Sequence, residues 1–224
     1  AALEDANGRG MLALAVVATS SFLLKSVRAQ AQAMLTRNLL SAPAFGSARA
    51  AAFFIKALTL ICGLPEYASH RETLIRTCDW LVSLYEKASS PDWEWFEDRL
   101  TYSNAVLPEA LLQAFQITGT KKYFEIGNKT LDFLIRHGFR DGIYVPIGQK
   151  GWFVKGKERV VYDQQPEDTA AMLQALKTMW KITGKKEYRN LMEECFGWFL
   201  GDNILRQALY DPITGGCYDG IGTQ

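Results

Sequence analysis

The sequence contains few residues that could bind a metal ion or form a disulfide. Of its 224 residues, only two are histidine and four are cysteine. The cysteines are far apart, form no CxxC pair and have no ligand spacing to a histidine; they are Cys62, Cys78, Cys195 and Cys217. Three of them fall at apolar positions of predicted helices, so we expect reduced, buried thiols and neither a metal site nor a cofactor.

A surplus of charge and a long apolar run are also absent. The 25 basic and 24 acidic residues leave a net charge of +1, which disfavours nucleic acid or an anionic membrane as the main partner. The longest apolar run, Met11 to Ala18, is much shorter than the roughly 20 residues that cross a bilayer. It follows Glu4 and Asp5 rather than basic residues, so it is not a typical signal peptide, and a cytoplasmic location is expected.

The hydrophobic pattern is helical along almost the whole chain, and it alternates between two kinds of helix. Apolar residues at three-and-four spacing predict amphipathic helices, whereas runs that are apolar on nearly all sides predict buried ones. The amphipathic ranges are 23–40, 69–87, 122–136 and 186–200. The buried ranges are 9–19 and 48–62, with 104–118 and 168–183 intermediate.

A short motif repeats between these helices. Gly63, Gly119 and Gly184 each follow a buried or intermediate range and each precede a tyrosine by four residues. A glycine suits the left-handed end of a helix, and the short link makes its two helices antiparallel neighbours. Repeats of about 60 residues predict stacked helical hairpins. We therefore predict an all-α fold, an α/α toroid with buried helices inside and amphipathic helices outside, in a single domain over residues 1–224.

The predicted ring is incomplete. Eight helices form about four hairpins, whereas a closed six-hairpin ring needs roughly twelve helices. The chain is therefore expected to be a fragment of a longer protein, an open arc, or a ring completed by another subunit. An open ring would leave apolar flanks on the helices at 1–19 and 186–200, which favours association, including a homo-oligomer.

The links that lead into the buried helices are long and should lie together on one face. They are residues 1–9, 41–49, 88–104, 138–167 and 210–222. The link at 138–167 is longer than a connection without structure or function usually is. Its sequence GWFVKGKERVVY predicts a small β-hairpin near 151–162 that turns at Gly156.

Acidic and aromatic residues accumulate in these links. Carboxylates and amides hydrogen-bond hydroxyl groups, and flat rings cover C–H faces, so a carbohydrate fits this composition best. Acids at a helix N-terminus also stabilise the helix dipole by about 0.3–1 kcal/mol each, so half or more of them are expected to be structural. Paired carboxylates could hydrolyse a glycosidic bond, one as proton donor and the other as nucleophile or base.

The arginines and histidines give weaker signals. Arg9 and Arg49 fall near the start of buried helices, where a cation opposes the dipole, so each is expected to pair with an acid, more often for structure than for function. His70 and His137 are expected on the face opposite the acids. That position disfavours a histidine-based epimerase, a Ser/His/Asp triad and a histidine metal site.

Several longer motifs resemble a known family. EDANGR at 4–9, SARAAAF at 47–53, WEWFEDRLTYSNAVLPEALL at 93–112, DQQPEDTAAM at 163–172 and WFLGDNILRQALYDPITGGCYDGI at 198–221 are similar to bacterial α/α-toroid domains of the six-hairpin glycosidase-like group. Members are commonly described as glycosyltransferases or occur with them. This chain has no Rossmann-like nucleotide-sugar module, and it lacks the further inner helix that follows the CYDGI segment in the family.

The resemblance marks a set of candidate residues. They are Asp5, Arg9, Glu97, Tyr102, Asn104, Gln165, Asp168, Asp211, Cys217 and Asp219. The candidate catalytic carboxylates are Asp168, Glu97 and Asp5, and Asp168 is ranked first because the family acid aligns with it. The candidate sugar contacts are Arg9, Trp93, Trp95, Tyr102, Asn104, Trp152, Gln165 and Asp219.

Three functions remain open at this point. The first is a carbohydrate-active enzyme, linked to glycosyl transfer or acting like a glycoside hydrolase through paired carboxylates, on an oligosaccharide or glycan. The second is a noncatalytic glycan-binding or scaffolding domain that partners a glycosyltransferase. The third, a helical interaction protein without a small ligand, would leave Trp93, Trp95 and Trp152 without an evident role.

Overall fold

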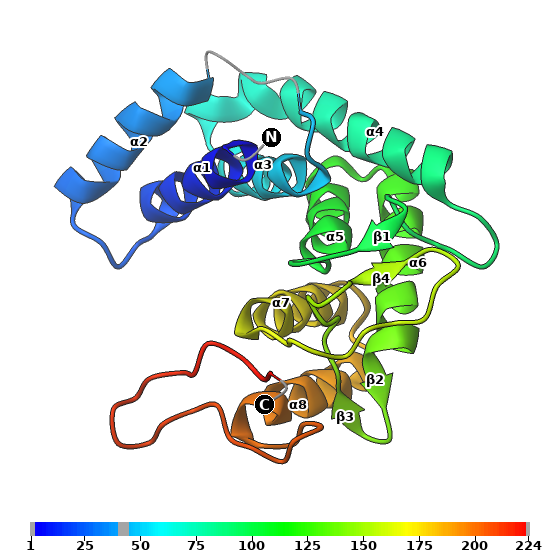
Figure 1. Ribbon diagram of the computed structural model, residues 1–224. Coiled ribbons are helices and arrows are strands. Elements are labelled where there is room, and N and C mark those ends of the chain that lie inside the picture. Colours follow the sequence, from blue (N-terminus) through cyan, green and yellow to red (C-terminus); the bar gives the residue numbers. More distant parts are fainter. Residues whose placement is uncertain (1–2, 40–44, 223–224) are drawn as a thin grey trace. The chain divides into compact units, whose positions relative to one another are not determined.

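The computed structural model describes residues 3–39 and 45–222, and these ranges are mostly helical (Figure 1). They contain eight α-helices, one 3-10 helix and four short strands, so the predicted all-α class is confirmed. The chain divides into two compact units, residues 1–87 with 110–127 and residues 88–109 with 128–224. The boundary falls within α5 (Val106–Thr118) and α6 (Lys121–Gly138). No helix in the described ranges is both long enough and apolar enough to span a membrane.

The first unit is built on α3 (Ala48–Ile61), whose residues are almost all buried. Among the described elements it packs on α1 (Glu4–Thr19) and η1 (Pro65–His70); the same unit contains α2 (Lys25–Leu39), which packs on α1, and nearly all of α4 (Arg71–Ala88). Small residues let α1 approach α3 closely, because a Cβ atom on Gly8 would lie only 2.8 Å from the Ala50 carbonyl oxygen. Alanine and glycine at this crossing therefore set the distance between the two helices.

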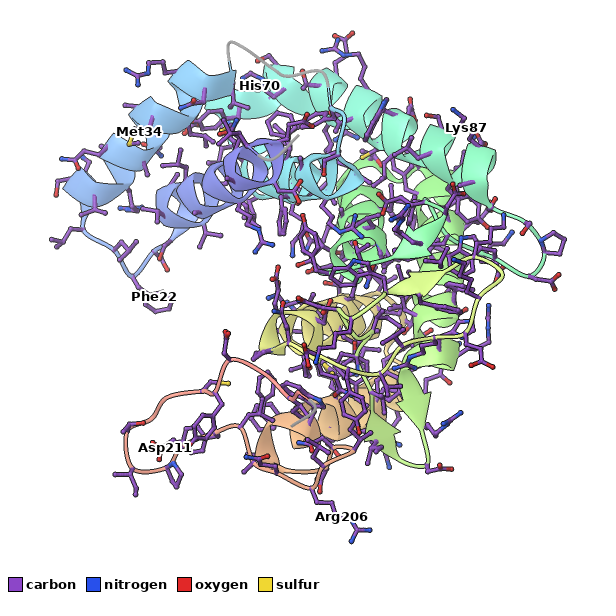
Figure 2. All side chains as sticks on the ribbon, in the orientation of Figure 1. Phe22, Met34, His70, Lys87, Arg206 and Asp211 are labelled. Carbon is purple, nitrogen blue, oxygen red and sulfur yellow. The ribbon has the colours of Figure 1, made fainter. Side chains whose placement is uncertain are left out.

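The prediction that residues 9–19 are buried on most sides is wrong in the described structure. Only Ala15 and Ala18 of that range are buried, and Val16 is 51% exposed. Among the described elements, α1 packs mainly on α2 and α3, so its remaining surface faces outward. Phe22, in the turn between α1 and α2, also points away from both helices (Figure 2). The predicted apolar flank is thus present on this unit.

The second unit contains α7 (Pro166–Thr183) and α8 (Lys186–Leu200), which pack against each other. Apolar periodicity explains the pairing, since the inward positions of α8 are filled by Tyr188, Cys195 and Trp198. On the outward side of α8, Phe196 and Leu200 are exposed. The range predicted for this helix, 186–200, agrees with the observed one.

Two of the three repeated glycines end a helix in the predicted way. Gly119 and Gly184 have φ values of +74° and +69°, the left-handed conformation that glycine adopts without strain. Gly63 does not, because Cys62, the residue that follows α3, has a right-handed conformation and the chain continues into η1. The α7–α8 hairpin therefore follows the predicted motif, whereas the link after α3 uses a 3-10 turn instead.

The strands form two separate two-stranded antiparallel sheets. β1 (Arg99–Leu100) pairs with β4 (Phe153–Val154), and β2 (Phe139–Arg140) pairs with β3 (Ile143–Tyr144). The predicted hairpin over 151–162 is only partly formed. Its first arm contains β4, which pairs with β1, and its second arm is joined to the first by a bond of 3.4 Å from the Val160 amide to the Trp152 carbonyl. The partner of β4 is distant in sequence, so local turn signals could not identify it.

Candidate functional site

The loop that leads into α5 holds two predicted sugar platforms, but it buries both of them. Trp93 and Trp95 are 3% and 0% exposed. The Trp93 ring meets Phe133 and Phe153 edge to face at centroid distances of 5.2 and 5.1 Å, and the Trp95 ring stacks on Phe133 at 6.4 Å. Such contacts are typical of a packed core. The platform role predicted for these two rings is wrong in this structure, because α6 and β4 already cover them.

Glu97, a predicted catalytic carboxylate, lies on the turn beside this aromatic cluster. Its backbone oxygen accepts a hydrogen bond of 2.8 Å from the Trp93 indole, which fixes the turn against the core. Its side chain is half-buried. Glu97 is therefore less buried than Asp168, the other predicted catalytic carboxylate of this unit.

Tyr102 and Trp152 are brought together by the pairing of β1 with β4. In this register Leu100 faces Phe153, which places the residues just outside the two strands close to each other. The ring centroids of Tyr102 and Trp152 are 6.5 Å apart with planes inclined by 47°, and both side chains are half-buried. Trp152 has a φ of +62°, which is uncommon for a residue with a bulky side chain. Strained backbone of this kind is concentrated at functional sites.

A hydrogen bond from Ser103 to Glu167 joins the same loop to the first turn of α7. Ser103 is buried and has a φ of +49°, so it is a second residue of this region, after Trp152, in the left-handed conformation. Neither Ser103 nor Glu167 is among the candidate residues predicted from the sequence. The position of the serine between two candidate residues, directly before a helix, was the only available signal.

Asp168 and Asn104, two further candidates, line one small cavity. Asp168 is 4% exposed, and the cavity has a volume of about 10 Å³, which is room for a single water molecule and not for a sugar ring. The side-chain oxygen of Asn104 accepts a hydrogen bond of 2.9 Å from the backbone amide of Thr101. The side-chain nitrogen of Asn104 donates one of 2.6 Å to the backbone carbonyl of Thr101. In this conformation Asn104 holds the loop before α5, and Asp168 lies behind the surface that a ligand would meet.

His137 lines the same cavity, which corrects the prediction that it lies opposite the acids. The prediction placed the C-terminal end of this outer helix on the wrong face. An outer helix runs antiparallel to the inner helix that follows it, so its C-terminal end lies on the face where that inner helix begins. The imidazole meets the rings of Phe133 and Phe153 at 4.5 and 5.0 Å. Burial lowers the pKa of His137, and the nearby positive charges of Arg159 and Arg136 lower it further.

Tyr144 adds a buried hydroxyl to this cavity. Burial raises its pKa well above the usual value, and the neighbouring Cys195 and Asp168 raise it further. A Cβ atom on Gly138 would lie 2.9 Å from the Tyr144 ring, so the glycine at the end of α6 makes room for it. The tyrosine therefore stays protonated and can donate a hydrogen bond inside the cavity.

Gln165 and Asp219 meet in a separate and much larger pocket. This pocket has a volume of about 260 Å³ and is formed by three chain segments. Its lining consists of Gln149, Asp163, Gln164, Gln165, Asp219, Gly220, Ile221 and Gly222. Asp163 is not among the candidates predicted from the sequence, because nothing in its spacing indicated that it would line one pocket with Asp219.

Asp5 and Arg9, the remaining candidates, belong to the first unit. Asp5 accepts a hydrogen bond of 2.5 Å from the hydroxyl of Ser47, the residue that caps the N-terminus of α3. The neighbouring Glu4 accepts two bonds, of 2.8 and 3.0 Å, from the Gly46 and Ser47 amides. The Arg9 guanidinium lies 4.8 Å from the centroid of the Phe53 ring. These contacts give the acids at the start of α1 a structural role in holding α3.

Asp211 and Cys217 lie on the loop that follows α8, where Figure 2 labels Asp211. Asp211 accepts hydrogen bonds of 2.6 Å from the Thr214 hydroxyl and 2.9 Å from the Ile213 amide. These bonds, the one from Thr214 first, lower the pKa of the Asp211 carboxyl. Asp211 therefore shapes a tight turn. Tyr210 and Cys217, on the two sides of this turn, form an isolated antiparallel β-bridge through their backbones.

The cysteines carry no sign of a metal site or a disulfide in the described residues. Cys78 and Cys195 are buried, and burial raises the pKa of both thiols. Cys62 is half-buried and Cys217 exposed, and all four are free thiols. No group of three or more His, Cys, Asp or Glu side chains in residues 3–39 and 45–222 is arranged to hold a metal ion.

The solved structures that share this fold include two whose proteins are described by function. One is a family GH76 α-mannanase of Bacteroides thetaiotaomicron, with a TM-score of 0.66, 12% sequence identity and a match over 98% of this chain and 62% of the mannanase. The other is a D-mannose isomerase, with a TM-score of 0.62, 12% identity and a match over 95% of this chain and 62% of the isomerase. The chain thus spans about 62% of the length of each. Both are α/α-toroid proteins, so the predicted fold class is confirmed.

The sequence matches no protein-family model and no curated protein. At 12% identity the two structural matches establish the fold alone. The fold that this chain adopts is therefore one that it shares with carbohydrate-active enzymes, and any finer assignment has to come from its own residues.

Proposed function

We propose that this chain binds a carbohydrate at the loops that lead into α5 and α7. The observation that carries the proposal is the pair of Tyr102 and Trp152, whose half-buried rings lie 6.5 Å apart at the edge of the β1–β4 sheet. A sugar has an apolar face of C–H groups and a rim of hydroxyls, so it needs an aromatic surface beside hydrogen-bonding side chains. Glu97, in the loop before α5, and Glu167, in the first turn of α7, are half-buried and supply such carboxylates.

The two fold neighbours guide the choice of ligand. They are described as an α-mannanase and a D-mannose isomerase, so mannose and manno-oligosaccharides are the first compounds to test. Because the chain spans only part of each neighbour, neither activity is assigned to it. A link to glycosyl transfer, in this chain or in a partner domain, is part of the proposal and rests on the motif resemblance.

Binding without turnover is the second candidate, and one observation favours it. The carboxylate ranked first for catalysis, Asp168, lies beside a cavity of about 10 Å³, which is too small for a sugar ring. Hydrolysis would need two carboxyl groups on either side of a glycosidic bond, roughly 5–10 Å apart. The catalytic hypothesis therefore depends on the more accessible carboxylates, Glu97 among them, or on a movement that opens the site around Asp168.

Isothermal titration with a panel of manno-oligosaccharides and other oligosaccharides tests the proposal directly. Trp152→Ala and Tyr102→Ala are expected to weaken binding by about tenfold each, because each removes one ring of the pair. The matched control is Trp180→Ala, which removes an exposed tryptophan near the other end of α7 and should leave affinity unchanged. Absence of binding to every sugar by a folded sample, or equal losses in the control, would overturn the proposal.

Product analysis separates an enzyme from a binding domain. Oligosaccharides that bind are incubated with the protein for long periods and analysed by chromatography, alone and with candidate sugar donors. Glu97→Gln and Asp168→Asn should abolish turnover and retain binding if the chain is an enzyme. Unchanged oligosaccharides in every sample, with binding intact, would favour the noncatalytic domain.

A further inference from the structure

The pocket between residues 163–165 and 219–222 is held open by its own backbone. Gln164 and Ile221 exchange two hydrogen bonds, of 2.8 Å from the Gln164 amide and 2.9 Å from the Ile221 amide. A third segment joins them, because the Gln149 amide donates a bond of 2.9 Å to the Asp163 carbonyl. Three segments distant in sequence are therefore fixed side by side, and the pocket between them is preformed.

Alternation along the chain directs the polar side chains into this pocket. Gln164 points to the core, where it is 0% exposed, accepts a bond of 2.7 Å from the Trp198 indole and donates one of 2.8 Å to the Val161 carbonyl. In extended backbone the neighbours of an inward residue point the other way, which accounts for Asp163 and Gln165 lining the pocket. Both can thus reach a ligand while Gln164 anchors their backbone.

Glycines form the opposite wall. A Cβ atom on Gly220 would lie 2.3 Å from the Gln164 carbonyl oxygen, and one on Gly222 would lie 2.9 Å from a carboxylate oxygen of Asp163. Between them, Ile221 is buried against Trp198 and Leu209. A side chain on Gly220 would push apart the two hydrogen-bonded segments, and one on Gly222 would displace the Asp163 carboxylate, so this wall is bare backbone at both positions.

The chemistry of the lining selects a class of ligand. The side chains that can reach the pocket are two carboxylates, Asp163 and Asp219, and two carboxamides, Gln149 and Gln165. The exposed ammonium group of Lys150 lies beside them, 3.5 Å from the Asp163 carboxylate. Paired carboxylates repel phosphates and carboxylic acids and accept hydrogen bonds from hydroxyl groups. A neutral ligand rich in hydroxyls therefore fits better than an anion or an apolar compound.

We propose that this pocket is a subsite for a single neutral sugar residue, whose hydroxyls are bound by Asp163 and Asp219 and by the carboxamides of Gln149 and Gln165. The volume of about 260 Å³ is just below the range of roughly 300–1,000 Å³ that drug-sized ligands occupy, which sets one ring as the limit. The inference rests on the proposed carbohydrate function and adds the size, charge and contacts of one subsite.

Two variants and one control test the subsite. Asp219→Asn removes the charge of one carboxylate and should weaken binding of the best manno-oligosaccharide by about tenfold. Gly222→Val fills the pocket next to Asp163 and should weaken binding at least as much. Asp141→Asn changes an exposed aspartate in the β2–β3 turn to a residue that tolerates its φ of +52°, and it should bind like the wild type.

A direct readout comes from amide NMR of the wild type with mannose, and separately with calcium chloride. Mannose should shift the amide signals of Gly220 and Gly222 and leave that of Gly63 in place. A calcium-induced shift lost in Asp219→Asn would overturn the sugar assignment, because carboxylates and amide oxygens also ligate that ion.

The failure of the subsite is distinguishable from the failure of the proposed function. Suppose that oligosaccharides bind, that Trp152→Ala weakens their binding, and that both pocket variants bind like the wild type. The proposed subsite is then wrong and the proposed function stands. If no sugar binds the folded wild type, both are wrong.

Discussion

Ser103 donates a hydrogen bond to Glu167, and this contact joins the loop before α5 to the first turn of α7. The adjacent residue, Tyr102, lies against Trp152, so the same loop carries both a structural tie and one ring of the proposed sugar surface. Ser103 and Trp152 both have positive φ values, +49° and +62°. The surface is therefore held by a small number of strained positions that the hydrogen bond and the β1–β4 pairing keep in place.

Comparing two substitutions of Ser103 separates backbone strain from the hydrogen bond. Ser103→Ala loses the bond to Glu167 and keeps a side chain at positive φ, whereas Ser103→Gly loses the bond and removes the strain. We expect Ser103→Ala to lower the free energy of unfolding by more than Ser103→Gly does, with a difference of about 1 kcal/mol. Urea denaturation followed by circular dichroism measures both. Equal stability of the two variants would show that the left-handed conformation of Ser103 carries no strain.

Gly8 and Gly10 provide a matched pair within α1. Alanine raises helix propensity equally at both positions, by about 0.5–1 kcal/mol. A Cβ atom at position 8 would lie 2.8 Å from the backbone oxygen of Ala50, whereas one at position 10 would meet nothing within 4 Å. Gly10→Ala should therefore raise the free energy of unfolding, and Gly8→Ala should lower it by about 1–3 kcal/mol through overpacking against α3. Thermal and urea unfolding of both variants test this; a stabilising Gly8→Ala would contradict the close α1–α3 approach.

The helices were predictable because their signal is local. A period of 3.6 residues and a glycine at the end sufficed to give α8, whose predicted range of 186–200 agrees with Lys186–Leu200. The burial of α1 was not predictable in the same way. An apolar helix is buried only where other elements cover it, and its sequence does not say which sides are covered, as exposed Val16 shows.

The site was predicted in its chemistry and less well in its geometry. The acidic and aromatic loops were identified, and Gln165 with Asp219 does line one pocket. Trp93 and Trp95, however, are equally suited to a core or to a ligand surface, and only their contacts with Phe133 distinguish the two. The roles of Ser103 and Asp163 were not predicted, because they come from partners that are remote in sequence.

Trp93 and Trp95 differ in one contact, which gives a third prediction. The Trp93 indole donates a hydrogen bond to the Glu97 carbonyl, whereas the Trp95 indole nitrogen is buried without a hydrogen-bond partner among the described residues. Phenylalanine removes a similar volume at each position, but only Trp93→Phe removes a hydrogen bond. We expect Trp93→Phe to cost about 1–2 kcal/mol more than Trp95→Phe in the free energy of unfolding. Urea denaturation at one pH measures the difference, and a larger loss in Trp95→Phe would contradict the assigned contacts.

The imidazole of His137 gives a prediction that depends on pH. Burial and the charges of Arg159 and Arg136 lower its pKa below the ordinary value of 6.5. Between the lowered pKa and 6.5 the unfolded chain is protonated while the folded chain is not. Stability from this group is therefore fully present above about pH 6.5 and is lost as the pH falls through the lowered pKa.

NMR titration of the two histidine rings between about pH 4 and pH 9 measures this pKa directly. His137→Gln removes one of the two signals and so assigns the other to His70, and His70→Gln serves as the matched control. The His137 signal should titrate below pH 6.5, and urea unfolding of His137→Gln should lose the part of the pH dependence that His70→Gln retains. A His137 ring that titrates at or above pH 6.5 would contradict the burial and the nearby positive charges that lower its pKa.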